Sequence, residues 1–324
     1  RNMAYSAGDT ILDDEYNAFV GNSSSPFGIN HIGGTGSAQY GLGESHVATV
    51  SAGNTVNASQ WNSLFSAMDV VAAHTGVSIS STTNKSAGDS IAIISALVTD
   101  LASLATAVAG GSTGTSATTT SSAKQTANSS STWNNSFTTE LSVTFANADK
   151  MRHFFNAGGR VRVTPSRTGS GTAGDGSGGI DPAWTNLNNS VGNLDIKAHT
   201  STRSGSGETV NTNGLDKGFH DLTTSYQTIL QMNDDTYPYA SNSLKIEAKL
   251  NAAVGSATVI TVKTTATDGT TNYTYNSNNT SNIDSQAYRN GQHRHELFIV
   301  STTSASLTNA HAESSTATVS NTTT

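Results

Sequence analysis

Hydrophobic residues in the first third of the chain recur at alternating steps of three and four residues. This spacing places them on one side of a helix and predicts helices in this region. The hydrophobic face is as narrow as the seam of a coiled coil, and each seam covers only a few heptads. We therefore expect short, coiled-coil-like helices. Their seam residues are Trp61, Leu64, Met68 and Val71 in one helix, and Ile94, Leu97, Leu101, Leu104 and Val108 in the next.

A short motif precedes each of three predicted helices. It reads Ser-Ala-Gly-Asp-Thr-Ile from Ser6, Ser-Ala-Gly-Asn-Thr-Val from Ser51 and Ser-Ala-Gly-Asp-Ser-Ile from Ser86. Internal repetition of this kind indicates one structural unit that is used more than once. The polar residues after the motif can accept hydrogen bonds from the free amide groups of a first helical turn. The candidate caps are Asp13 for the first helix, Asn57 or Ser59 for the second, and Asp89 or Ser90 for the third.

The hydrophobic seams need a partner that shields them from water. Asp100 is the one charged residue between Ile91 and Ala109, so a helix there would be poorly soluble with water on all sides. We expect the seams to be buried between copies of the chain in a homo-oligomer, with a trimer as the expected form. The alternative is that the helices pack within one chain as a small bundle. No membrane span is expected, because a charge and several hydroxyl groups interrupt the apolar run.

Beyond residue 131 the period of the hydrophobic pattern changes to two. Leu141, Val143 and Phe145 alternate with polar residues, and several later segments show the same alternation. This period is typical of half-buried strands. Strands separated by turn-rich stretches predict an antiparallel β-sandwich, interrupted by short helices after Asn147 and from Pro182. The fold class is therefore mainly β, with an α-helical N-terminal region.

These patterns divide the chain into three parts. Residues 1–109 are expected to form a helical region for attachment and oligomerisation, and residues 132–324 a β-sandwich domain. Residues 110–131 are mostly Gly, Ser, Thr and Ala, a composition that cannot form a core. They are therefore predicted to be a linker or an extended ribbon.

Composition narrows the classes of function. The chain of 324 residues has 16 Lys and Arg against 23 Asp and Glu, a net charge of −7, and contains no cysteine. The acidic balance disfavours nucleic acid as a partner, because binding phosphates needs a clustered basic face. The lack of cysteine excludes disulfides and thiolate chemistry. Charged residues are only 12% of the chain, so we expect a neutral surface rich in hydroxyl groups.

His293 and His295 are the candidate metal ligands. Residues two apart on a strand point to the same face, so the two imidazoles could hold a transition-metal ion. A symmetric trimer would bring the pairs of its three copies together on its axis. The alternative is a pair of solvated histidines near the start of a strand, since no third ligand lies nearby in the sequence.

No set of residues stands out as catalytic. Asp234, Asp235 and Glu247 could supply paired carboxylates for cleavage of a glycoside, but nothing in the sequence sets them apart. No nucleophile-elbow motif stands between a predicted strand and a predicted helix. We expect no enzymatic activity and no cofactor.

Several longer stretches have a distinctive order of residues. In the N-terminal third they are Asp14-Glu15-Tyr16-Asn17 after the first motif, Tyr40-Gly41-Leu42-Gly43, and Gln60-Trp61-Asn62-Ser63-Leu64 after the second motif. The later ones are Ala148-Asp149-Lys150-Met151-Arg152-His153-Phe154-Phe155-Asn156-Ala157-Gly158-Gly159-Arg160-Val161-Arg162-Val163, Trp184-Thr185-Asn186-Leu187 and Leu222-Thr223-Thr224-Ser225-Tyr226-Gln227-Thr228.

In these stretches the chain resembles virion structural proteins of large tailed phages that infect marine cyanobacteria. The resemblance implies a particle component without enzymatic activity, located in the virion as part of the tail, neck or fibres. It implies contacts with copies of the same chain and with other virion proteins, and it brings no catalytic residues. The alternative function is a receptor-binding fibre protein whose β-domain recognises a polysaccharide of the host surface.

Overall fold

The chain divides into two compact units. The first consists of Arg1–Thr120, Asp149–Gly159 and Ser301–Ala312, and the second of Ser121–Ala148, Arg160–Val300 and Glu313–Thr324. The computed structural model describes residues 13–44, 46–89, 94–114, 117–128, 136–168, 180–235, 239–269, 273–277, 280–284, 292–303, 307 and 319–323.

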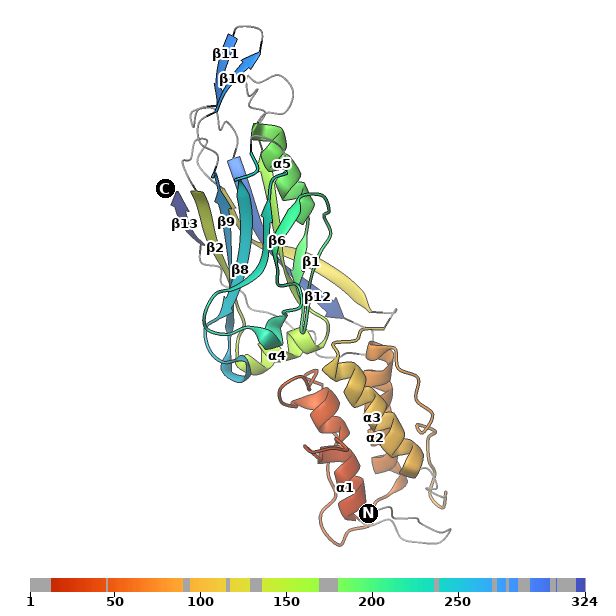
Figure 1. Cartoon of the computed structure of the whole chain (residues 1–324). Coiled ribbons are helices and arrows are strands. Elements are labelled where there is room, and N and C mark those ends of the chain that lie inside the picture. Colours follow the sequence, from red (N-terminus) through yellow and green to blue (C-terminus); the bar gives the residue numbers. More distant parts are fainter. Residues whose placement is uncertain are drawn as a thin grey trace. The chain divides into compact units, whose positions relative to one another are not determined.

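The first unit is helical. Its longer helices are α1 (Asp13–Gly21), α2 (Ala58–Thr75) and α3 (Ile94–Ala109), drawn side by side in Figure 1. Helix α3 contacts both α1 and α2. A short π-helix, η1 (Asn30–Gly34), and helix α4 (Ala148–Asn156) complete the unit. None of the helices described by the structure is both long enough and apolar enough to cross a membrane.

The predicted seams form the core of this unit. Trp61, Leu64, Met68 and Val71 of α2 and Leu97, Leu101, Leu104 and Val108 of α3 are all at most 2% exposed within a single chain. They belong to one hydrophobic cluster with residues of α1. The expectation that other copies cover these residues therefore loses its basis, and no coiled coil is present among the described helices. The alternative of a small bundle within one chain describes the unit. The side chain of Ile94 lies outside the described residues.

The local signals for helix ends are partly as predicted. Asn57 caps α2 by accepting a hydrogen bond from the N–H of Gln60 (3.1 Å), and the Gln60 side chain accepts one from the N–H of Asn57 (2.8 Å). This reciprocal pair is a capping box. Asp13 is instead the first residue of α1, and its carboxylate accepts a hydrogen bond from the N–H of Gly53 (3.4 Å). Asp89 accepts one from the N–H of Ser86 (2.7 Å), and residues 90–93 lie outside the described segments.

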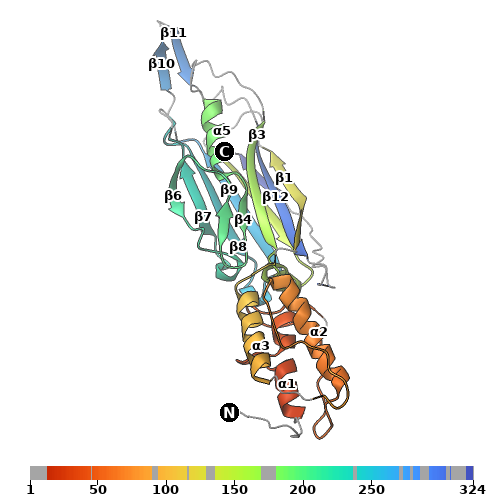
Figure 2. The same ribbon diagram turned by 90° about the vertical axis from the view of Figure 1, so that its right-hand side faces the viewer.

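The second unit is built from antiparallel sheets. One sheet has the order β1-β12-β3-β4-β5, and the other has the order β13-β2-β9-β8-β7-β6 (Figure 2). The bounds of the first are β1 Thr118–Asn128, β12 Gln292–Thr303, β3 Arg160–Thr168, β4 Leu194–Ile196 and β5 Ser201–Arg203. The bounds of the second are β13 Val319–Thr323, β2 Ser136–Thr144, β9 Val259–Thr267, β8 Ser243–Leu250, β7 Gln227–Asn233 and β6 Thr209–Asn213. A separate antiparallel hairpin pairs β10 (Tyr273–Ser277) with β11 (Thr280–Asp284).

The period-two prediction agrees with the observed burial. Strands β2 and β9 alternate between buried and half-buried residues along their whole length, as strands with one covered face do. Helix α5 (Ile180–Val191) contacts β3 and β8. Two single 3₁₀ turns, η2 (Phe219–Asp221) and η3 (Val254–Ser256), lie in the connections. The prediction of a mainly β fold with antiparallel strands is confirmed.

Two segments differ from the predicted organisation. The expected linker, 110–131, contains strand β1, because its β-branched threonines favour extended backbone even without a hydrophobic pattern. Helix α4 has the predicted bounds but, from Asp149 on, belongs to the helical unit and not to the β-domain. Its polar side chains bind backbone groups of the N-terminal region, an attachment that the pattern of hydrophobic residues does not reveal.

Candidate functional site

His293 and His295 of β12 share one face, as predicted, and that face points into the interior of the second unit. Both side chains are fully buried. The Nδ1 atom of His295 lies 2.8 Å from Oγ1 of Thr139 on β2, which belongs to the other sheet. The Nε2 atom of His293 accepts a hydrogen bond from the guanidinium of Arg167 (3.3 Å), and its ring lies edge-on to Trp184 with the centroids 4.9 Å apart.

This environment keeps both imidazoles neutral. Burial lowers the pKa of His295 to about 3. Burial, with Arg167 and His295 nearby, also holds the pKa of His293 well below its usual value. The predicted arrangement around a trimer axis would need these rings at the surface, so their burial contradicts it. Within the described segments, no group of three or more His, Cys, Asp or Glu side chains could hold a metal ion.

The three candidate carboxylates do not converge. Asp234 and Asp235 follow the end of β7 that pairs with Ser243, whereas Glu247 lies opposite Thr228 near the other end of that strand. The Glu247 carboxylate forms ion pairs with Lys245 and Lys263, both at 2.8 Å. Burial raises the pKa of Glu247, but the hydrogen bonds from these lysines prevail and hold it below its usual value. Glu247 is thus an ionised structural group.

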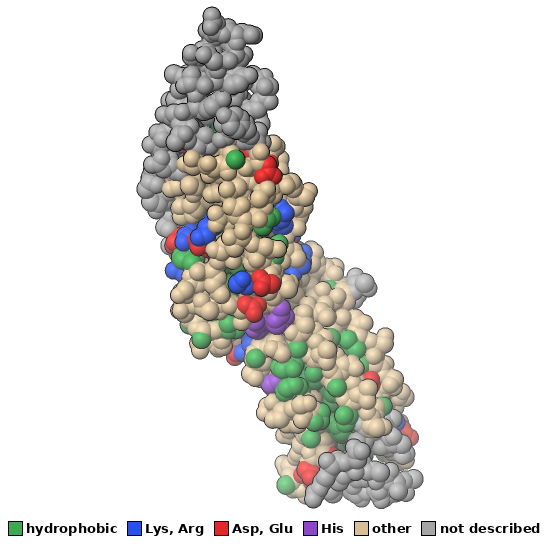
Figure 3. All heavy atoms as spheres, in the orientation of Figure 1, with side chains coloured by type: hydrophobic (Ala, Val, Ile, Leu, Met, Phe, Trp, Pro, Cys, Tyr) green, Lys and Arg blue, Asp and Glu red, His purple; other side chains and the backbone are tan. Residues whose placement is uncertain are grey.

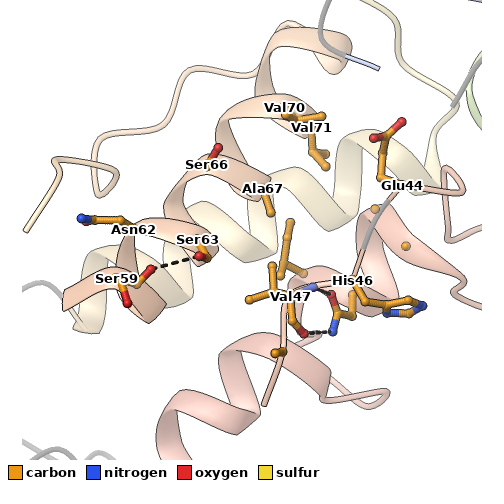
Figure 4. A pocket seen from close by; sticks show the side chains of 15 residues that line it. Glu44, His46, Val47, Ser59, Asn62, Ser63, Ser66, Ala67, Val70 and Val71 are labelled. Carbon is orange, nitrogen blue, oxygen red and sulfur yellow. Dashed lines mark hydrogen bonds between the residues drawn. The ribbon is translucent and has the colours of Figure 1, made fainter. Parts of the chain in front are cut away.

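A groove of about 620 Å³ opens on the helical unit (Figure 4). One wall is a face of α2, and the other is formed by Glu44 and by residues 46–48; the π-helix η1 also contributes to the lining. Short π-helices occur often at functional sites, which makes the groove a candidate for binding. The lining residues that Figure 4 labels are Glu44, His46, Val47, Ser59, Asn62, Ser63, Ser66, Ala67, Val70 and Val71.

Hydrogen bonds from two side chains, Asn30 and Tyr16, hold the wall of this groove in place. The Asn30 side chain donates to the C=O of Val47 and accepts from its N–H, with both distances 2.8 Å. Tyr16 of α1 donates to the C=O of Gln60 at 3.1 Å and lies 3.4 Å from the C=O of Ala48. These bonds satisfy backbone groups that no strand partner covers.

The Ser-Ala-Gly motif forms the same turn wherever the structure describes it. The carbonyl of Ser51 accepts a hydrogen bond from the N–H of Asn54 (3.0 Å), and the carbonyl of Ser86 accepts one from Asp89 (3.1 Å). The glycine of each motif has a positive φ, 82° at Gly53 and 94° at Gly88. A four-residue turn with a positive φ at its third position requires glycine there. The repetition seen in the sequence is therefore a repetition of turn geometry.

Three polar residues of α4 bind one N-terminal loop. The Arg152 guanidinium donates to the carbonyls of Thr35, Gly36 (3.1 Å) and Tyr40 (3.4 Å), and it forms an ion pair with Asp149 (2.9 Å). In this way a single side chain satisfies several carbonyls of the loop.

Asn156 and two histidines add to this attachment. The Asn156 amide donates to the carbonyls of Tyr40 (2.9 Å) and Gly41 (3.2 Å). His153 donates from Nε2 to the carbonyl of Thr35 (3.1 Å), and His74 of α2 donates from Nε2 to the carbonyl of Ala157 (3.1 Å). The spacing of hydrophobic residues does not reveal these roles. An available signal was the placement of Arg, His and Asn among the buried aromatic residues of a short helix.

Comparison with known proteins supplies no neighbour for this chain. It matches no protein-family model, no curated protein and no solved structure. Any functional conclusion therefore depends on the residues and geometry of the chain itself.

Proposed function

We propose that this protein is a non-enzymatic structural component of a tailed-phage virion, located in the tail, the neck or a fibre. The observation that carries the proposal is the use of polar side chains in the stretches that resemble such proteins. Asn17 and Asn62 each bind the N–H and the C=O of one residue in an extended segment. Arg152 and Asn156 bind loop carbonyls. These side chains are engaged in holding the backbone.

Such contacts favour a structural role for physical reasons. A buried backbone group that lacks a partner costs about 1–3 kcal/mol, so side chains that supply partners stabilise irregular loops. A catalytic acid, base or nucleophile needs a polar atom that can reach the substrate. The side-chain amides of Asn17, Asn62 and Asn156 and the guanidinium of Arg152 instead bind the chain's own backbone groups.

The second unit suits presentation on a particle. We propose that its two sheets form a β-sandwich, which the bond between Thr139 and His295 supports because it joins one sheet to the other. Hydroxyl pairs link β2 and β9, with Thr138 3.2 Å from Thr265 and Ser142 2.8 Å from Thr261. On the face drawn in Figure 3, most of the described surface of this unit is tan, the colour of the backbone and of side chains that are neither charged, histidine nor hydrophobic. Burying such a surface against another protein removes few charges from water. It therefore suits protein contacts, because the cores of interfaces are poor in charged residues.

We also propose that copies of the chain associate on the particle, with a trimer as the expected form, and that other virion proteins are further partners. The seams of α2 and α3 are not available for this contact, because one chain already covers them. Association must use outer surfaces of the two units. On α3 the outer side is uncharged and includes Val98, which is 37% exposed.

Quantitative mass spectrometry of gradient-purified particles tests the proposal. The sample is the phage whose genome encodes this sequence, and the control is an abundant host protein that purification should remove. We expect the chain at a constant ratio to the major capsid protein through successive gradients. A ratio that falls in step with the host protein would overturn the virion assignment.

A further inference from the structure

Two buried histidines take part in attaching α4 to the rest of the helical unit. His153 is 5% exposed and His74 is fully buried. Both imidazoles contact a backbone carbonyl through Nε2, at Thr35 and at Ala157 respectively. A carbonyl oxygen only accepts hydrogen bonds, so each of these contacts needs a proton on Nε2, and this is the tautomer that attaches α4. A second proton would therefore bind at Nδ1.

The surroundings of the two Nδ1 atoms do not favour a positive charge. The Nδ1 atom of His74 is buried and makes no hydrogen bond in the described structure. The Nδ1 atom of His153 faces Gly43 so closely that a β-carbon placed on that glycine would lie 2.8 Å away. Placing a charge at the Nδ1 atom of His74 without a partner or water costs several kcal/mol.

Arg152 adds an electrostatic penalty at His153. Its Nη2 atom lies 3.2 Å from Nε2 of His153, and both atoms donate to the carbonyl of Thr35. The guanidinium is always charged, so protonation of His153 would place a second positive charge directly beside it. The carboxylate paired with Arg152, Asp149, is itself largely exposed, which weakens its compensating field.

The charged groups that act on the two imidazoles come from α4 and from the segment before α2. Burial lowers the pKa of His153, and Arg152 and Lys150 lower it further. The hydrogen bond to Thr35 and the Asp149 carboxylate oppose this shift only in part. Burial also lowers the pKa of His74, against the hydrogen bond to Ala157 and the Glu44 carboxylate. The net direction is downward for both residues.

We propose that α4 is an acid-releasable attachment: proton uptake by His74 and His153 detaches this helix from α2 and from the loop 35–43 of the helical unit. The inference is independent of the virion role, because it depends only on contacts within this unit. In the sequence α4 connects β2 to β3, so its release also frees the chain between these two strands.

The sign and size of the effect follow from linkage. When α4 is released, both imidazoles meet water and regain a pKa near 6.5, whereas in the attached state their pKa is lower. Below pH 6.5 the released state therefore binds more protons and becomes favoured. Each histidine shifts the equilibrium by at most about tenfold per pH unit, between its lowered pKa in the attached state and 6.5, so the pair shifts it by at most about a hundredfold per pH unit.

Hydrogen exchange of the full chain at pH 7.5 and pH 5.0 tests this, after correction for the intrinsic pH dependence of exchange. We expect peptides covering residues 148–158 and 35–43 to lose protection at pH 5.0 by about tenfold or more. The protection of peptides from α3 should change much less between the two pH values. Because the readout is local, acid effects on the second unit do not enter it. Equal corrected protection of 148–158 at both pH values would overturn the proposal.

Variants separate the two histidines from other acid effects. Glutamine retains an N–H donor but cannot take up a proton, so the double variant H74Q/H153Q should lose the acid response of residues 148–158. The matched control is H46Q, at an exposed histidine of the groove, and it should respond as the original chain does. An unchanged acid response in the double variant would overturn the proposal.

If the double variant does not fold at pH 7.5, NMR titration of the original chain decides. The ring C–H signals of His74 and His153 should show no ordinary titration near pH 6.5 while α4 stays attached. A simple titration near pH 6.5, with protection of residues 148–158 retained, would overturn the proposal.

Discussion

The side-chain amide of Asn17 binds both the N–H and the C=O of Val50, each at 2.8 Å, and so takes the place of a neighbouring strand. Asn62 binds Lys85 in the same way, at 3.0 Å and 2.7 Å. Asn17 and Asn62 hold the same position in their repeats, and the residue that each one binds directly precedes the next Ser-Ala-Gly motif. The repeats of the helical unit are thus linked head to tail, because each helix holds the start of the repeat that follows.

The first prediction concerns this link. Asn62→Ala removes both hydrogen bonds to Lys85, and we expect a loss of about 1–2 kcal/mol in the free energy of unfolding of the helical unit. The control is Asn54→Ala, whose exposed side chain should contribute within about 0.5 kcal/mol. Urea denaturation, monitored by hydrogen exchange of α2 peptides, measures the difference in the free energy of unfolding between the two variants. Equal stability of the two variants would contradict the role of Asn62.

The second prediction concerns the close contact between Gly43 and His153. Gly43 has a φ of 76°, and an added β-carbon would lie 2.8 Å from Nδ1 of His153. The control is Gly53→Ala, because Gly53 has a similar φ of 82° but open space around the added atom. We expect Gly43→Ala to cost more than Gly53→Ala, by about 1–3 kcal/mol, since only the former adds steric overlap to backbone strain. Thermal unfolding of both variants gives the comparison.

The third prediction distinguishes a core from a subunit interface. Leu101 is 1% exposed within one chain, so Leu101→Asp should unfold the helical unit by placing a charge in its core. Ala102→Asp changes the exposed neighbour and should leave the unit folded. Circular dichroism and light-scattering mass report both outcomes. A folded Leu101→Asp variant that differs from the original chain only in its number of subunits would restore the interface interpretation.

The fourth prediction concerns the stability of the second unit in acid. The pKa of His295 is lowered to about 3 in the folded chain, against about 6.5 when unfolded, so the unfolded state binds the proton first as the pH falls. Stability is therefore full above pH 6.5 and decreases below it by about 1.4 kcal/mol per pH unit for this residue.

Unfolding in urea at pH 7 and pH 5, followed by the fluorescence of Trp184, measures this slope. His295→Asn retains a side chain that can bind Thr139 but cannot be protonated. Below pH 6.5 its free energy of unfolding should therefore decrease less steeply than that of the original chain, by about 1.4 kcal/mol per pH unit. The exposed-site variant His46→Gln serves as the control. If His295→Asn shows the full pH dependence of the original chain, His295 is not the group that titrates.

The fold was predictable where a local pattern determines it. The three-four spacing located α2, the candidate cap Asn57 marked its start, and period two located β2 and β9. These signals depend on residues that are close in the sequence. They also identified correctly that Leu64 and Leu101 are buried.

The same patterns do not specify what covers a buried face. Periodicity gives the direction of a hydrophobic stripe but not its partner, so Leu101 and Trp61 were assigned to other subunits although α1, α2 and α3 of one chain cover them. The histidines of β12 were expected at a surface for the same reason. The roles of Arg152 and Asn30 depend on contacts between residues far apart in the sequence, and a single sequence carries no record of such pairs.

The position that Asn17 and Asn62 occupy in their repeats is taken by Leu97 in the third. Leu97 is fully buried and its side chain has no donor or acceptor, so it cannot form hydrogen bonds with the backbone before a further motif. The series of asparagine links from one repeat to the next therefore ends at Leu97, and this limits the number of linked repeats in the helical unit. A longer array would need an asparagine restored there and another hydrophobic group to fill the vacated space.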